Sequence, residues 1–270
     1  MTTAVQPDAR RFVKAAVIPP PPAPRARGRR RGAALPEPPA VEVLLETGKN
    51  QAAVVGSEIV AFVTGVTPER REAIINSALL AQLVANTKVA DRTRVYEWYD
   101  EYFKVLANIG WAIQQVSWAE YVEQGAGFQA HEAILKVAAA LLGPGTGALA
   151  LVTTTVEALK AMDKDNPWIT LFNRESQVAK TAHFQVTLAE QAADGQFLVS
   201  TMAFGLEAKS KVTQVLFFKV KKNEATLKRH QGKVTINTRV LDQVKDDLQA
   251  KLAAHAESYV KALPDFAPSR

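Results

Sequence analysis

The sequence predicts an α+β fold in which helices come first, a meander of antiparallel strands follows, and one helix closes the chain. Apolar residues recur at helical spacing between residues 68 and 109 and again between residues 128 and 162. Beyond Trp168 the apolar residues alternate with polar ones, which is typical of strands. From Thr238 to Leu263 they return to steps of three and four, which predicts the final helix.

The composition is that of a folded protein, and it excludes several kinds of chemistry. With 270 residues, of which 47% are hydrophobic and 22% charged, the chain can bury a full core as one large or two small domains. It has no cysteine, which excludes disulfide scaffolds, thiolate metal sites, cysteine nucleophiles and S-acylation. The lack of cysteine is compatible with a reducing or an oxidising compartment.

The excess of positive charge is concentrated in the first 40 residues. They hold eight of the 33 basic side chains and two of the 27 acidic ones, so residues 41–270 carry 25 of each. A neutral body does not favour specific binding to nucleic acid. Prolines from Ile18 to Pro24 and the like charges after them predict a disordered arm over residues 1–40, then a domain over 41–264 and a tail over 265–270. The arginines after the prolines are Arg25, Arg27, Arg29, Arg30 and Arg31.

The first elements of the domain are expected between residues 41 and 122. Thr67 and Pro68 supply an N-cap and a first-turn proline for a helix that runs to about Ala85. Residues 111–122 mix aromatic and β-branched side chains, fit a strand or an irregular helix, and are interpreted as a strand. The other expectations are an edge strand at residues 41–45, a helix-like stretch at 51–63 and a helix at 91–108.

Two apolar helices are expected at residues 128–142 and 148–162. Residues 137–156 contain no charged side chain, and twenty such residues have the length of a membrane-spanning helix. Gly143, Pro144, Gly145 and Gly147 break this run in the middle, so a buried helical hairpin is favoured. Insertion of the pair into a membrane as a hairpin stays open.

Four strands are expected after Trp168. Phe184, Val186 and Leu188 alternate with polar residues, and Asp194–Gly195 supplies a hairpin turn to the next strand. That strand carries Leu198, Met202, Phe204 and Leu206 on one face. A third strand is expected at residues 212–222, with Leu216, Phe218 and Val220 on one side, and a fourth at 225–236.

From Asn166 to Ala225 the order of features resembles the Cyt family of cytolytic delta-endotoxins, a fold family that includes Evf-like virulence factors and volvatoxin-like proteins. The residues that carry the resemblance are Asn166 to Ile169, Phe184, Asp194 to Phe197, Phe204, Leu216 to Phe218, Lys222, Glu224 and Ala225. Upstream, the order of helices agrees, although no motif does.

The resemblance implies a single domain in which helical hairpins cover both faces of a central antiparallel sheet. It implies a membrane-active, pore-forming or lipid-perturbing bacterial toxin or virulence factor, soluble until it binds lipid and activated by proteolytic trimming of its ends. Evf-like proteins carry a fatty acyl group on a cysteine, and this chain has none. The aromatic-rich segment from Tyr96 to Phe128 and the Pro/Arg arm also depart from the family pattern.

Three sets of residues are candidates for contact with a membrane. The strands between His183 and Ile236 have about the ten residues that a tilted strand needs to cross a bilayer, although strands of this length are also routine under helices. Trp98, Trp111 and Trp118 could face lipid headgroups, or they could pack in the core. The candidate strand residues are Phe184, Val186, Leu198, Met202, Phe204, Leu216 and Phe218.

The arginines of the arm have three competing interpretations besides that of a solvated tail: a site of activating cleavage, attraction to anionic lipid, and contacts with nucleic acid or a packaging machine. Because the toxins of the resemblance are trimmed at their ends, cleavage near Arg31 is preferred. The alternative function is a non-lytic binding or cargo protein of a secretion or packaging machine, with the arm as its address.

No enzyme, cofactor or metal site is predicted. The four histidines are scattered, His131–Glu132 lacks the second histidine of a zinc protease, and no Gly-x-Ser-x-Gly motif occurs. The start of the chain shows no secretory signal pattern. We therefore expect synthesis in the cytoplasm and release or delivery by another route, with a lipid membrane as partner and a homo-oligomer on it.

Overall fold

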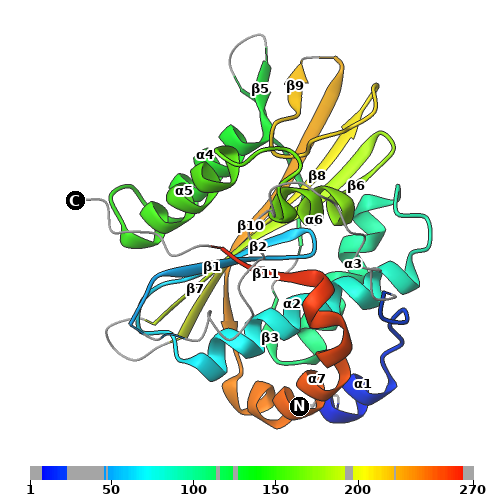
Figure 1. The fold of residues 1–270 in the computed structure, drawn as a ribbon, viewed down its shortest axis with the longest axis vertical. Coiled ribbons are helices and arrows are strands. Elements are labelled where there is room, and N and C mark those ends of the chain that lie inside the picture. Colours follow the sequence, from blue (N-terminus) through cyan, green and yellow to red (C-terminus); the bar gives the residue numbers. More distant parts are fainter. Residues whose placement is uncertain are drawn as a thin grey trace, which may run out of the picture.

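The computed structural model describes residues 8–22, 46, 48–113, 116–123, 127–191, 197–221 and 223–263, and places a central sheet between two layers of helices (Figure 1). The first helical layer consists of α1 (Ala9–Ala15), α2 (Pro68–Lys88), α3 (Val95–Asn108) and α7 (Thr238–Tyr259). The second helical layer consists of α4 (Ala130–Leu142), α5 (Gly147–Lys160) and α6 (Pro167–Ser176). Each layer shares one hydrophobic cluster with the sheet, so the predicted α/β domain with both faces covered is confirmed.

The sheet is mixed rather than wholly antiparallel. Within the described residues nine strands join it, in the order β11–β1–β2–β7–β8–β10–β3, with β4 beside β10 and β6 beside β7. β2 and β7 run parallel, because the chain passes through both helical layers between them and returns in the same direction. The strands are β1 (Gln51–Val55), β2 (Glu58–Phe62), β3 (Trp111–Ala112), β4 (Ala119–Glu120), β6 (Gln177–Val178), β7 (Thr181–Gln191), β8 (Phe197–Ala208), β10 (Ala225–Ile236) and β11 (Val260–Ala262).

The helix-like stretch predicted at residues 51–63 is wrong, since β1 and β2 form a hairpin there. Both strands are buried on both faces, so apart from Gln51 and Glu58 at their starts their residues are apolar and show no period that separates strand from helix. Gly56 makes the turn at a φ of +56°, and a Cβ there would lie 2.2 Å from Oε1 of Gln82. The turn therefore requires glycine for both its conformation and its contact.

The strand predicted at residues 212–222 is also wrong over most of its length. Of the described residues 212–221, only β9 (Lys219–Lys221) is a strand, and it pairs with β5 (Gly127–Gln129) in a separate small sheet. The residues before β9 form a turn in which the carbonyl oxygen of Leu216 accepts a hydrogen bond from the backbone N–H of His131. Leu216 and Phe218 thus lie outside any strand.

The helices α2, α3, α4 and α5 lie where the sequence predicted helices. α2 begins at Pro68 after Thr67. α6 was not predicted; Asn166 caps it by accepting a hydrogen bond from the N–H of Trp168 at 3.2 Å, with Pro167 in its first turn. α7 ends at Tyr259, and the last residues of the expected helix form β11 against β1.

Part of the predicted disordered arm is folded. α1 packs on α7, with Val13 fully buried and Nε of Arg10 2.8 Å from a carboxylate oxygen of Asp247. Ala9, Phe12, Val13 and Ala16 recur at helical spacing, which gives this short segment an apolar face. The arm's arginines, residues 25–31, and the edge strand expected at 41–45 lie outside the described residues.

The apolar hairpin of α4 and α5 is confirmed. Gly143 and Gly145 connect the helices at positive φ angles of +87° and +75°, and both helices pack over the sheet (Figure 1). Within the described parts of the chain, no helix combines the length and the apolar composition needed to cross a bilayer.

Candidate functional site

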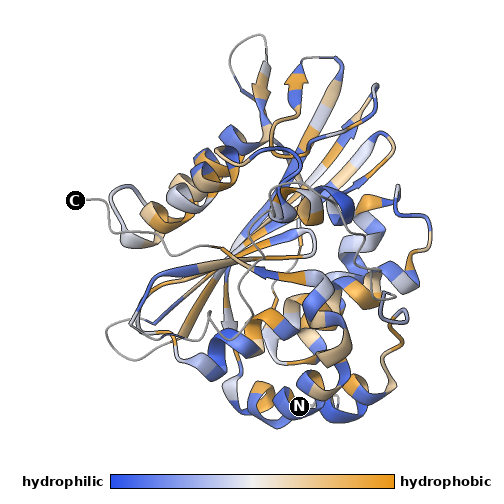
Figure 2. Cartoon of the chain, viewed as in Figure 1, coloured by the Kyte–Doolittle hydropathy of each residue, from blue (hydrophilic) through white to orange (hydrophobic). Residues whose placement is uncertain are grey.

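The long strands β7 and β8 present two chemically different faces over most of their length, whereas the neighbouring β10 places Arg229, Gln231 and Lys233 on the same side as Phe204 and Met202. On one face Phe184, Val186 and Leu188 of β7 lie beside Phe204 and other apolar residues of β8, under the second helical layer. On the opposite face, which the first helical layer covers, the side chains over the half toward the start of β7 and the end of β8 are polar or small. Figure 2 shows hydrophobic and hydrophilic residues mixed along these strands. The polar or small residues are His183, Gln185 and Thr187 of β7 and Gly205, Ala203 and Thr201 of β8, and the other half of this face carries Ala189, Val199 and Phe197.

A sheet covered by helices on both faces ordinarily has apolar side chains on both. Here a set of polar side chains lies between the sheet and the first helical layer, and all of them are buried. We call this set the polar layer. Its members are Ser57, Glu58, Gln82, Tyr99, Tyr102, His183, Gln185 and Thr187.

Glu58 of β2 is the buried carboxyl group of the polar layer. Its side chain has no exposed surface, and Oε2 accepts hydrogen bonds from the hydroxyl of Tyr102 at 2.8 Å and from Nε2 of Gln82 at 3.3 Å. Burial raises the pKa of Glu58 from 4.5 to about 7, and the hydrogen bonds from its neighbours oppose this only in part. The carboxyl group therefore changes charge near neutral pH inside the protein.

Gln82 of α2 ties the helix to the β1–β2 turn. Its Nε2 also donates to the carbonyl oxygen of Val55 at 2.9 Å, and its Oε1 accepts from the backbone N–H of Ser57 at 2.9 Å. The hydroxyl of Ser57 lies 3.0 Å from Oε1 of Gln185 on β7. These bonds link α2, the turn and the central strand in one network.

Tyr99 of α3 reaches the backbone of both β7 and β8. Its hydroxyl lies 3.0 Å from the carbonyl oxygen of Phe184 and 2.9 Å from that of Phe204, and it accepts a hydrogen bond from the N–H of Phe204. Phe184 and Phe204 are directly paired in the sheet. The hydroxyl of Tyr99 thus holds α3 to the sheet through main-chain atoms.

His183 is buried against the aromatic side chains of α3. Its ring centroid is 4.0 Å from that of Trp98, and neither ring nitrogen has a hydrogen-bond partner among the residues that the structure describes. Burial, and to a smaller extent the charge of Arg92, holds the pKa of His183 well below its usual value of 6.5. The imidazole is therefore neutral in the folded protein.

The polar layer is incompletely hydrogen-bonded. Within the described residues, partners are lacking for Oε1 of Glu58, Nε2 of Gln185, Oγ1 of Thr187 and both nitrogens of His183. Each buried polar atom without a partner costs about 1–3 kcal/mol. The contact between the first helical layer and the sheet is therefore less stable than an apolar contact of the same size would be.

The candidate strand residues fall into two groups in the structure. Phe184, Val186, Met202 and Phe204 are fully buried on the apolar face of β7 and β8, and Leu198 is half-buried at the other end of β8. Leu216 and Phe218 belong to the turn before β9, so the structure brings together five of the seven on long strands.

The tryptophans proposed to face lipid belong to the core or to its edge. Trp98 is fully buried and Trp111 is 3% exposed. Trp118 is half-buried, with its ring centroid 5.1 Å from that of Tyr96 and 4.7 Å from that of Tyr99. In this conformation the three tryptophans pack with the first helical layer.

The remaining histidines are bound to separate main-chain carbonyl oxygens. A ring nitrogen of His131 lies 3.1 Å from the oxygen of Leu216, and one of His255 lies 2.9 Å from that of Pro19. In the described part of the chain, no group of three or more His, Asp or Glu side chains is placed to hold a metal ion.

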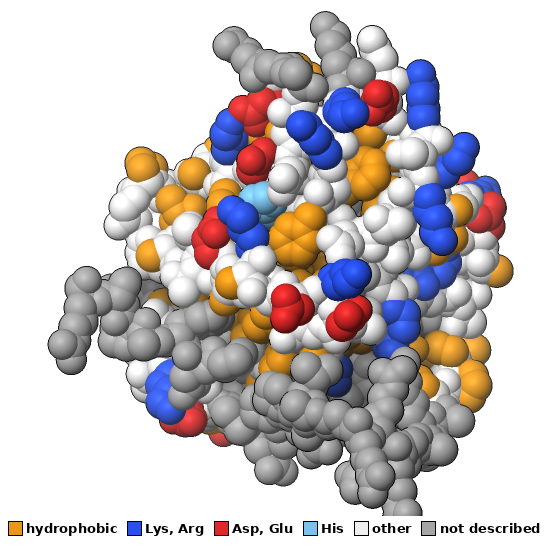
Figure 3. All heavy atoms as spheres, turned by 45° about the horizontal axis from the view of Figure 1, so that its top comes forward, with side chains coloured by type: hydrophobic (Ala, Val, Ile, Leu, Met, Phe, Trp, Pro, Cys, Tyr) orange, Lys and Arg blue, Asp and Glu red, His pale blue; other side chains and the backbone are white. Residues whose placement is uncertain are grey.

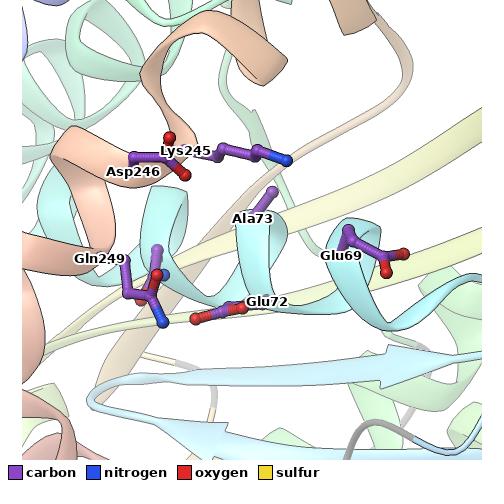
Figure 4. Close-up of a pocket in the computed structure, with 7 residues that line it drawn as sticks. Glu69, Glu72, Ala73, Lys245, Asp246 and Gln249 are labelled. Atoms are coloured by element: carbon purple, nitrogen blue, oxygen red, sulfur yellow. The ribbon is translucent and has the colours of Figure 1, made fainter.

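A charged hollow of about 130 Å³ lies between α2 and α7 (Figure 4). Glu69 and Glu72 of α2 face Lys245, Asp246 and Gln249 of α7 across it. The charged side chains are solvent-exposed to a large degree, which distinguishes this hollow from the polar layer. We assign no binding function to it.

The solved structures that are similar to this chain include those of two proteins. One is a delta-endotoxin, with a TM-score of 0.40 and 15% identity over 80% of this chain and 91% of the other. The second is the Evf virulence factor, with a TM-score of 0.36 and 13% identity over 76% of this chain and 85% of the other. Neither a protein-family profile nor a curated protein sequence matches the chain.

Both neighbours are of the kinds named by the resemblance of residues 166–225. At this identity and TM-score the likeness says nothing about activity. The polar layer, by contrast, is a feature of this chain's own residues, and the sequence signal for it was a single acid, Glu58, within the apolar run 52–63.

Proposed function

We propose that this chain is a membrane-active toxin or virulence factor whose strands β7, β8 and β10 enter a lipid bilayer after the helices separate from the sheet. The observation that carries the proposal is that β7 and β8 have one apolar face and one partly polar face. A strand in a pore needs an apolar face toward lipid and a polar face toward water. β7 and β8 have both faces, although helices cover both in this structure.

The lengths of the strands support the same function. β7 has 11 residues and β8 and β10 have 12 each, and a tilted strand crosses a bilayer with about 9–11. A closed pore needs about eight strands or more, so the three long strands of one chain would have to combine with those of other copies. The proposed active form is therefore a homo-oligomer on the membrane.

The position of α1 supports control by proteolysis in the arm. α1 and the residues after it are anchored on α7 through Val13, the Arg10–Asp247 ion pair and the contact between His255 and Pro19. A cut among the arginines 25–31 would leave this segment attached by non-covalent contacts alone. Its dissociation would then uncover part of the first helical layer.

The first prediction tests this function directly. Liposomes loaded with a self-quenching dye should release it when the protein is added, and trypsin treatment under native conditions should increase the release. The measurement is fluorescence over time, with boiled protein as control. If neither untreated nor trimmed protein releases dye or sediments with liposomes, the proposal is wrong.

The alternative is a non-lytic cargo protein that a secretion or packaging machine recognises through the arm. Because α1 is part of the fold, a test by deletion of residues 1–40 would also disturb the domain. Replacing Arg25, Arg27, Arg29, Arg30 and Arg31 by Gln avoids this. Under the alternative, the variant keeps its thermal stability and loses delivery from the producing cell, whereas unchanged delivery would contradict an address function.

A further inference from the structure

The end of the sheet where β7 and β10 begin and β8 ends is rich in lysine. Between Gly205 and Glu224 the sequence has five lysines and two glutamates, although residues 41–270 as a whole are neutral. We use the name lysine end for the surface that is formed here by five exposed lysines, one of which precedes β7. The five lysines are Lys180, Lys209, Lys211, Lys219 and Lys221.

Backbone hydrogen bonds bring these lysines together from separate segments. The N–H of Ala208 donates to the carbonyl oxygen of Lys180, and the N–H of Val212 donates to that of Ala179, both within 3.0 Å. The N–H of Lys209 donates to the carbonyl oxygen of Glu224 at 2.8 Å, next to the turn between β9 and β10. The lysines are thus held in place by the sheet and its turns.

Few acidic groups neutralise the lysine end. Lys221 has an ion pair, with its Nζ 3.5 Å from a carboxylate oxygen of Glu224, and none is formed by the other four within the described residues. On the opposite end of the molecule, Arg10, Lys14 and Arg70 are paired with aspartates of α7. Figure 3, turned so that the top of Figure 1 comes forward, shows Lys and Arg side chains gathered along one side of this end.

Apolar side chains lie within the same surface. Phe217 and Phe218 are half-buried in the turn between Lys211 and Lys219, while Val215 and Leu216 are buried and anchor that turn. Aromatic rings flanked by lysines suit the headgroup region of a membrane, where the ring contacts acyl chains and the ammonium group stays in water.

We infer that the lysine end is the surface by which this chain docks on an anionic lipid bilayer. The inference rests on the proposed function and deepens it, since it names the lipid class and the orientation of the protein. Docking in this way would bring the ends of β7, β8 and β10 to the membrane first.

A membrane fits these side chains better than a nucleic acid does. The five positively charged groups of the lysine end are ammonium groups, which act as point charges, whereas phosphate and base recognition in nucleic acids relies heavily on the bidentate guanidinium of arginine. The half-buried phenylalanines also give the surface an apolar component that a phosphate backbone would not contact.

The test is sedimentation with liposomes of phosphatidylcholine alone and of an equal mixture of phosphatidylcholine and phosphatidylserine. The variant K180Q/K209Q/K211Q removes three charges from the lysine end, and K88Q/K164Q/K245Q removes three exposed charges elsewhere as the matched control. Since each lysine near an anionic surface contributes about a factor of five to tenfold in binding, the first variant should partition on the order of 100-fold more weakly. Raising the salt concentration should weaken the wild type in the same direction.

Equal binding of the wild type to both lipid compositions would overturn the inference, and so would equal loss in the two variants. Binding of duplex DNA that depends on the three lysines, without binding of anionic vesicles, would overturn it in favour of a nucleic acid partner. Lysine-dependent binding without any dye release would uphold the docking surface and contradict the proposed function. Equal dye release by the two variants would uphold the proposed function and contradict the docking surface.

Discussion

Through Glu58 alone, the free energy of unfolding is expected to fall by about 3 kcal/mol between acidic and mildly alkaline pH, and Glu58→Gln is expected to remove this fall. In the unfolded chain the carboxyl group of Glu58 ionises around its ordinary pKa of 4.5, whereas in the folded protein its pKa is about 7. Below 4.5 both states hold the proton, and the contribution to stability is complete. As pH rises from 4.5 to 7 the unfolded state is ionised first, so stability is lost across this window and the loss is complete above it.

In the folded protein the other titratable groups that face Glu58 do not change charge in this window. Burial raises the pKa values of Tyr99 and Tyr102 well above 10, so both stay neutral. His183 is neutral in the folded protein because burial holds its pKa well below 6.5, but the unfolded chain takes up a proton on this residue below about 6.5, so its contribution to stability rises with pH and opposes that of Glu58. The difference between the wild type and Glu58→Gln at each pH therefore isolates the contribution of Glu58.

Glutamine can occupy the position of Glu58 without losing the hydrogen bonds. Its Oε1 can accept from Tyr102 and Gln82, and its amide can donate to the hydroxyl of Thr187, which faces the carboxyl group. Above pH 7 the variant should be more stable than the wild type, because no buried charge remains. Urea denaturation over a series of pH values measures this, with the exposed Glu157→Gln as control. If the wild type and Glu58→Gln lose stability in parallel from pH 4.5 to 7, the assignment is wrong.

The sequence was most informative where local chemistry determines an element. Thr67 and Pro68 predicted the start of α2, and the glycines between α4 and α5 predicted their connection. The β1–β2 hairpin was missed because its strands are buried on both faces, which removes the alternation that identifies a strand. The seven-residue helix α1 was missed because the prolines and arginines that follow it dominate the composition of the first 40 residues.

The polar layer shows a more general limit. Alternation in β7 predicted one buried face and one polar face, and both predictions are correct for the residue types. The expectation that comes with such a pattern is that the polar face meets water, whereas α2 and α3 cover it here. The lysine end could not be predicted from the sequence either, because its residues come from three segments that the sheet and its turns bring together.

Locking α3 to the sheet should abolish dye release. Val95 is the first residue of α3 and is buried over the polar face of β8. A Cβ placed on Gly205 would lie 3.1 Å from Cγ1 of Val95, and a disulfide separates one Cβ from the opposite sulfur by about 3 Å. The double variant V95C/G205C therefore has suitable geometry for a cross-link, and the chain has no other cysteine that could compete.

Small adjustments at this position are feasible. The Cβ on residue 205 would also lie 3.0 Å from Cε1 of Tyr96, whose side chain is half-buried and able to move. The cross-link should raise the free energy of unfolding by about 4 kcal/mol, because it closes a loop of more than a hundred residues in the unfolded chain. Thermal unfolding with and without a reducing agent checks that the bond has formed and that the fold is intact.

Under oxidising conditions the double variant should give no more dye release than vesicles without protein, and a reducing agent should restore release to the wild-type rate. Release requires the polar face of β8 to lose its helical cover, and the disulfide prevents this. V95C and G205C as single variants are the controls and should be active in both conditions. Because the cross-link replaces none of the lysines of the lysine end, the locked protein should still sediment with anionic vesicles. A locked protein that releases dye as fast as the reduced one would show that α3 stays on the sheet during activity, and the proposed separation of the first helical layer would be wrong.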